Sequence, residues 1–219
     1  MTDWGTVSAL ATAGGTLVLA AASFASIRSA DRAAQSAERA VQASLRPLLV
    51  ASRLEDPVQK LHWIDGHWTK LDGSMGYVHV AEDGQIYLGM SIRNIGPGIG
   101  VIHGWRFWTG EVGTDVGQPE VDSFRRQSRD LYIAPSDTGF WHAAVRETED
   151  PDHGPLLLPI KNRERIALEL LYGDYEGGQR TLSRFTLVPR DLAVHGEAAE
   201  SHWYCQVVRH WNIDRPQPR

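Results

Sequence analysis

The chain has 219 residues, of which 42% are hydrophobic and 22% are charged. This balance is typical of a folded protein and argues against a disordered chain, a collagen-like repeat and a membrane protein with many spans. The single cysteine, Cys205, excludes an internal disulfide, and the net charge of −5 argues against a nucleic-acid partner.

The first predicted element is a transmembrane helix over residues 4–27. These 24 residues carry no charge, and Arg28 follows directly. As a helix they would span about 36 Å, enough to cross a hydrocarbon core of about 30 Å. The large apolar residues favour insertion, but the glycines and hydroxyl residues offset much of that gain, so insertion is favourable by a small margin. Two alternatives stay open: a cleaved signal peptide, which would need a basic N-terminal region that is absent here, and a buried helix of a soluble domain.

The residues that flank this segment predict its orientation. Four arginines follow it within about 20 residues, and no lysine or arginine precedes it. These arginines are Arg28, Arg32, Arg39 and Arg46. Because basic residues favour the cytoplasmic side, we expect a single span of the inner (plasma) membrane with a cytoplasmic C-terminal domain.

An alanine-rich helical connector is predicted over residues 28–46, ending before Pro47. Small residues recur at helical spacing in both N-terminal segments and could form a helix-packing face. The candidates are Gly5, Ala9, Ala13, Ala30, Ala34 and Ala37. Such a face lets two helix backbones approach closely and predicts a weak homo-oligomer. The alternatives are a chance pattern in an alanine-rich helix and an exposed stalk.

Short apolar runs broken by turn residues predict a soluble β domain over residues 47–219. The predicted strands are PLLVASRL, VQKLHWI, GYVHVA, QIYLGMSIRNI, GVIHGWRFWTG, RDLYIAP, GFWHAAV, RIALELLYGDY, RTLSRFTLVP and WYCQVVRHW. Apolar residues alternate in several of them, which indicates one buried face per strand. Gly177 and Gly178 are expected at the tip of a hairpin. The fold class predicted is mainly β, an immunoglobulin-like antiparallel sandwich of two packed sheets.

Several segments together carry a resemblance over nearly the whole chain. They are RSADRAAQSAERAVQASLRPLLV, SIRNIGPGIGVIHGW, RDLYIAPSDTGFW and LLYGDYEGGQRTLSRF. In them the chain resembles a group of uncharacterised bacterial proteins with one N-terminal span and a C-terminal β-sandwich domain. The resemblance implies this architecture and assigns no activity.

No segment of the sequence predicts a catalytic, cofactor-binding or metal site. The glycine-rich segment NIGPGIG at 94–100 precedes a predicted strand, whereas a phosphate-binding loop precedes a helix, so we expect a turn. The nine histidines lack metal-ligand spacing, and Cys205 lies in a predicted buried strand. Asp174 and Glu176 are expected to be solvated turn acids.

One basic cluster remains as a candidate binding site. Arg125, Arg126 and Arg129 lie close together and could contact phosphate or a lipid headgroup; the alternative is a solvated strand edge. With no catalytic pattern present, we expect a membrane-anchored cytoplasmic binding or scaffolding module, with the lipid bilayer and a protein partner as its contacts. The competing function is a membrane-tethered hydrolase with an unrecognised site. The sequence contains no G-x-S-x-G motif, which would mark a nucleophilic serine.

Overall fold

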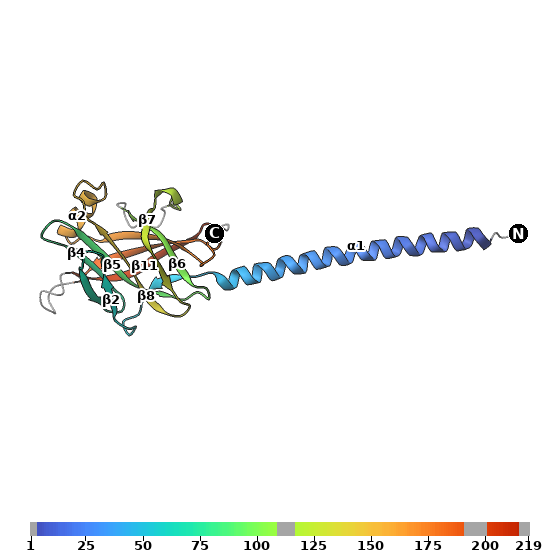
Figure 1. The fold of residues 1–219 in the computed structure, drawn as a ribbon, viewed down its shortest axis with the longest axis horizontal. Helices are drawn as coiled ribbons and strands as arrows, with labels where there is room; N and C mark the ends of the chain where they lie inside the picture. The colour runs from blue at the N-terminus through green and yellow to red at the C-terminus, as the bar shows by residue number, and fades with distance from the viewer. Residues whose placement is uncertain (1–3, 109–116, 191–200, 215–219) are drawn as a thin grey trace. The chain divides into compact units, whose positions relative to one another are not determined.

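The structure is a computed structural model that describes residues 4–108, 117–190 and 201–214, of which residues 4–11 are described by their backbone alone (Figure 1). Its elements are α1 (Trp4–Leu45), β1 (Leu49–Ala51), β2 (Gln59–His62), β3 (Trp68–Leu71), β4 (Met75–Val80), β5 (Ile86–Asn94), β6 (Gly100–Trp108), η1 (Val121–Ser123), β7 (Arg125–Ile133), β8 (Thr138–Val145), α2 (His153–Lys161), β9 (Ile166–Gly173), β10 (Thr181–Pro189) and β11 (His202–Asn212). The chain divides into two compact units, Met1–Ser44 and Leu45–Arg219.

The single helix α1 covers both of the N-terminal segments that the sequence distinguishes. It runs without a break (Figure 1) because helix-forming residues fill it, and it ends two residues before Pro47. Every side chain from 12 to 44 is exposed, including those of Leu17, Leu19 and Phe24. No helix among the described residues combines the length and apolar character that a membrane span needs. The spanning role of residues 4–27 stays a prediction.

The β domain is built on one nine-stranded antiparallel sheet that curls into a half-barrel. The strand order is β1-β5-β4-β11-β10-β9-β6-β7, and β8 pairs with the other edge of β5. The mainly β prediction is therefore confirmed, but the two separate sheets of an immunoglobulin-like sandwich are wrong. Strand pairing is continuous from β8 round to β7, and register shifts in the β6 and β10–β11 pairings help the sheet to bend.

The core of the β domain lies inside the curl, and a smaller core lies outside it. Ile86 and Leu88 of β5 point into the larger core and are fully buried, as their alternation predicts. On the other face of β5, Tyr87 packs against Leu61 of the β2–β3 hairpin. A Cβ atom at Gly89 would lie 2.3 Å from Leu61 Cδ2, so any larger residue there would displace the Leu61 side chain.

Arg46, one of the four arginines on which the predicted orientation rests, is bound within the β domain. Its guanidinium group donates to Gln179 Oε1 at 2.6 Å and to Asn212 Oδ1 at 3.0 Å. It also forms an ion pair of 2.8 Å with Asp214. These contacts fix the segment that leads into β1, because three polar partners hold one rigid guanidinium plane.

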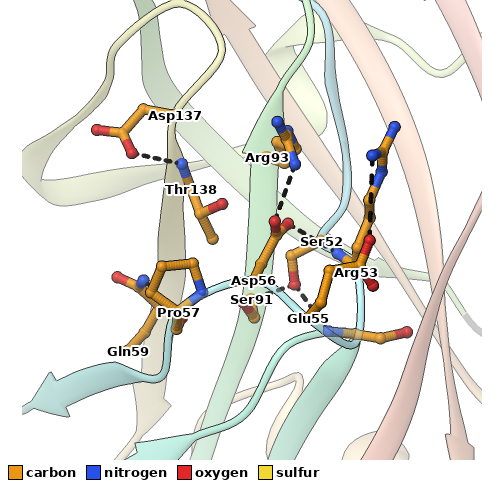
Figure 2. A network of polar contacts seen from close by, with 11 residues as sticks. Ser52, Arg53, Glu55, Asp56, Pro57, Gln59, Ser91, Arg93, Asp137 and Thr138 are labelled. Carbon is orange, nitrogen blue, oxygen red and sulfur yellow. Dashed lines mark hydrogen bonds and ion pairs between the residues drawn. The ribbon is translucent and has the colours of Figure 1, made fainter.

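A second polar network holds the loop after β1 against β5 (Figure 2). Asp56 accepts hydrogen bonds of 2.8 Å from the Arg93 side chain and from the backbone N–H of Arg53. Beside it, Ser52 Oγ donates to Ser91 Oγ at 2.7 Å. Since these groups satisfy one another's hydrogen bonds, the network stabilises the loop and is not a ligand site.

Candidate functional site

A groove of about 660 Å³ lies along the seam between β7 and β8. Among the described strands, β7 pairs with β6 alone and β8 with β5 alone, so no backbone ladder joins their facing edges. Gln127 bridges the seam instead, since its Nε2 donates to the His142 carbonyl at 3.1 Å and its Oε1 accepts from Trp141 Nε1 at 3.2 Å. The volume is in the range of small-molecule binding sites.

Four arginines line this groove (the arginine groove), and none of the acidic residues that the structure describes does. They are Arg125, Arg126 and Arg129 of β7 and Arg146, which follows β8. The structure thus brings all three arginines of the predicted cluster to one groove. It adds a fourth that the sequence analysis missed, because the approach of β7 to β8 leaves no local mark in the sequence.

Two of the four arginines have carboxylate partners. Arg125 forms ion pairs with Asp150 at 2.6 Å and Asp152 at 2.9 Å, and its guanidinium lies 5.3 Å from the centre of the Trp105 ring. The hydrogen bond from Arg125 lowers the pKa of Asp150. Arg146 pairs with Asp65 at 3.1 Å.

The other two, Arg126 and Arg129, carry the groove's unpaired positive charge. Both side chains are exposed, and neither forms a hydrogen bond, ion pair or ring contact with any described residue. Arginine presents planar donors that match the oxygens of a phosphate group. The groove therefore offers two free guanidinium groups to an anion.

His142 adds a buried polar group to the same groove. Its side chain is 7% exposed, and its Nδ1 atom has no hydrogen-bond partner in the described part of the chain. Burial, followed by the positive charges of Arg129 and Arg146, lowers the pKa of His142 to about 4. The imidazole is therefore neutral at pH 7, and its Nδ1 atom is free to hydrogen-bond a ligand or a water molecule.

A closed arginine cluster lies on the other face of β6, β9 and β10. Glu169, which is fully buried, accepts hydrogen bonds from both Arg106 and Arg184. The Arg184 guanidinium lies 4.1 Å from the centre of the Trp108 ring and 5.1 Å from that of Trp211. Each charge here has a partner, so this cluster is structural.

The glycine and acidic candidates serve turns. Gly96 lies in the loop between β5 and β6, where a Cβ atom would be 2.5 Å from the Arg46 carbonyl oxygen. Asp174 is buried, contrary to the prediction of a solvated acid. It accepts hydrogen bonds from the backbone of Gly178 and Gln179 and so caps the predicted hairpin turn, while Glu176 is exposed.

The histidines are spread over the β domain, and the described residues contain no group of three metal-ligating side chains. His62 lines the arginine groove. His67 stacks on Tyr87 at 4.1 Å between ring centres, and its Nε2 lies 2.9 Å from Tyr77 Oη. These rings are mutually satisfied and act as packing.

The nucleophile candidates are sealed inside the β domain. Cys205 is buried, as predicted, and burial raises the pKa of its thiol to about 12. Ser183 Oγ lies 2.6 Å from His210 Nδ1, but Ser183 is fully buried and also bonds Tyr172 Oη at 2.8 Å. No described carboxylate contacts His210, so the pair lacks both access and an orienting acid.

The small-residue candidates all belong to α1. Ala13, Ala30, Ala34 and Ala37 are exposed. Gly5 and Ala9 lie in the part of α1 whose side chains are outside the described residues. The proposed packing face therefore stays a prediction.

Comparison with known proteins gives no relative from which a function could be carried over. No family model, curated protein or solved structure matches the chain. A function must therefore be argued from the chemistry of the arginine groove.

Proposed function

We propose that the chain is a membrane-anchored binding module whose β domain binds a phosphate-bearing anion in the arginine groove. The observation that carries this proposal is that Arg126 and Arg129, which have no carboxylate partner among the described residues, line the same groove as His142, whose Nδ1 atom has no hydrogen-bond partner there. A hydrogen bond to a charged group contributes about 1.5–3 kcal/mol, so two guanidinium groups suffice for measurable affinity.

Membrane anchoring by residues 4–27 is the second part of the proposal. It rests on 24 residues without charge, followed by Arg28, Arg32 and Arg39. The exposed Leu17, Leu19 and Phe24 side chains are apolar surface that a bilayer would cover. By the bias of basic residues, the β domain is cytoplasmic. Carbonate extraction of membranes tests the anchor, and release of the full chain into the soluble fraction would contradict it.

A weak homo-oligomer through α1 accompanies this proposal. Ala30, Ala34 and Ala37 leave a narrow strip of small side chains along the helix, against which a second copy could pack closely. Ala37→Glu should reduce cross-linking of the full chain in membranes. Unchanged cross-linking would favour an exposed stalk.

Titration of the full chain with pyrophosphate by calorimetry tests the groove. We expect Arg126→Ala combined with Arg129→Ala to lower the affinity by at least about tenfold. Arg165→Ala is the matched control. Arg165 is exposed, forms no hydrogen bond or ion pair with any described residue, and does not line the groove. Equal affinity in the double variant and the control would overturn the proposal.

The competing hydrolase function has less support. The buried Ser183 and His210 pair is closed to a substrate, and the groove holds no described nucleophile beside a base except Ser128, an exposed strand residue. A hydrolase screen whose signal disappears in His142→Gln would reverse this preference.

A further inference from the structure

One aliphatic side chain stands exposed at the rim of the arginine groove. Ile64 lines the groove and is 95% exposed, the largest fraction among the large apolar side chains described. Single exposed apolar residues are common on protein surfaces and need no explanation by themselves. Two features set Ile64 apart: the backbone on either side of it is anchored to the sheet, and two of the arginines that line the same groove have no carboxylate partner among the described residues.

Both neighbours of Ile64 are anchored to the sheet. Trp63 is buried, and its Nε1 donates to the Ala143 carbonyl of β8 at 3.0 Å. Asp65 accepts a hydrogen bond of 2.9 Å from Tyr87 Oη and pairs with Arg146. Ile64 is thereby presented to solvent from a fixed backbone.

The turn itself is closed by the backbone. The N–H of Trp63 donates to the His67 carbonyl at 2.8 Å, and the N–H of Gly66 donates to the Trp63 carbonyl at 3.1 Å. Gly66 has φ of +88°, which glycine adopts without strain. A preformed turn loses little conformational entropy when its tip is buried against a partner.

The charges beside this tip select the kind of partner. Arg126 and Arg129, neither of which has a carboxylate partner in the described part of the chain, line the same groove as Ile64. A soluble phosphate ester would use the arginines and leave Ile64 in water. A phospholipid surface uses both, since its phosphates meet the guanidinium groups while its acyl chains receive the aliphatic side chain.

We propose that the rim of the arginine groove docks on an anionic phospholipid surface, with Arg126 and Arg129 on headgroup phosphates and Ile64 among the acyl chains. The inference rests on the proposed function, because it names a lipid headgroup as the source of the phosphate. It gives the β domain a membrane contact of its own, in addition to that of residues 4–27.

A fluorophore at position 64 reads this contact locally, whatever the helix does. Ile64→Cys is labelled with bimane in the full chain, in which the buried Cys205 stays unlabelled. The protein is reconstituted into vesicles of brominated phosphatidylcholine, with or without phosphatidylserine. Leu158→Cys on α2, an exposed aliphatic position outside the groove, is the matched control.

We expect bromine quenching at position 64, well above that at position 158, when phosphatidylserine is present. Arg126→Ala with Arg129→Ala should lower the docking equilibrium constant about 30-fold, because each arginine near an anionic surface contributes a factor of about five. Arg165→Ala should leave it unchanged. Pyrophosphate binding by the labelled proteins that keep both Arg126 and Arg129 shows that their groove is folded.

Three results would overturn the inference. Equal quenching at positions 64 and 158, with pyrophosphate still bound, would mean that the groove takes a soluble phosphate and that the proposed function stands. Equal quenching with and without phosphatidylserine would mean an apolar contact without headgroup recognition. Absence of both quenching and pyrophosphate binding would remove the proposed function as well.

Discussion

Two arginine clusters on the β domain each place an arginine beside a tryptophan, and the two clusters differ in how their charges are satisfied. In the closed cluster, Arg106 and Arg184 share the buried carboxylate of Glu169. In the arginine groove, Arg126 and Arg129 have no partner among the described residues. The arginine side chains are structural in the closed cluster and available for binding in the arginine groove.

Whether the charges are paired, rather than the residue type, therefore distinguishes a structural cluster from a binding site. A buried charge with its partners removed is costly, so a substitution in the closed cluster should destabilise the fold. An exposed guanidinium group costs little to leave unpaired, because water solvates it until an anion arrives. Variants in the two regions should therefore affect different measurements.

The largest effect is expected from Glu169→Gln in the closed cluster. The amide keeps the shape of the side chain but removes the charge that holds the buried Arg184. Breaking one partner of a buried pair costs about 3–5 kcal/mol of unfolding free energy. Urea unfolding of the variant, with the exposed Glu149→Gln as control, measures this. A loss no larger than that of the control would mean that the cluster is solvated.

His142 should make the stability of the β domain depend on pH. Because the folded pKa is about 4 and an unfolded histidine titrates near 6.5, the unfolded state binds the extra proton between these values. The stability contributed by neutral His142 is present above pH 6.5 and is lost as pH falls toward 4, by about 2–3 kcal/mol. His142→Gln should flatten this part of the profile in denaturant unfolding.

The flattening will be partial. Burial also lowers the pKa of His79 and His210, which lie outside the groove. Both histidines will still contribute to the slope of unfolding free energy against pH in the variant. The difference between the variant and the wild-type profile isolates His142. Parallel profiles between pH 4 and 6.5 would show that its imidazole titrates normally.

Arg125 lies between the two regions in character, since it lines the groove and yet is paired. Arg125→Gln removes the partner of Asp150 and Asp152 and should cost about 1 kcal/mol at pH 7, because the pair is partly exposed. The lowered pKa of Asp150 places this contribution above the ordinary carboxyl pKa of about 3.9, and it is lost as pH falls through the lower folded value. A cost that persists unchanged at pH 2 would point to lost packing on Trp105 instead.

Local pattern made much of the fold predictable from the sequence. Each of the ten predicted strands overlaps an observed strand, since alternation and turn residues are local signals, although the predicted RDLYIAP begins four residues after the start of β7. The strand β3 (Trp68–Leu71) was missed because its run of four residues mixes charged and apolar types. Helix α2 (His153–Lys161) was missed because Pro155 and Pro159 interrupt its pattern.

The pairing of strands that are distant in the chain could not be predicted from the sequence, and the candidate site depends on that pairing. One curled sheet and two separate sheets use the same alternating strands, so alternation could not distinguish them. Arg125, Arg126 and Arg129 were found because they are neighbours in the chain. His142, Arg146 and Ile64 join them through the approach of β8 and the β2–β3 hairpin to β7, which no local motif records.

The smallest effect on stability is expected from Arg126→Ala combined with Arg129→Ala, and it completes the contrast with Glu169→Gln. Since both side chains are exposed and unpaired, their loss should change the unfolding free energy by less than about 0.5 kcal/mol. Burial is the main cause of the lowered pKa of His142, but removal of the Arg129 charge should relieve part of the repulsion that adds to it. Urea unfolding alongside the calorimetric titration gives both readings on one preparation. A stability loss comparable to that of Glu169→Gln would show that these arginines serve the fold, and the distinction between the two regions would fail.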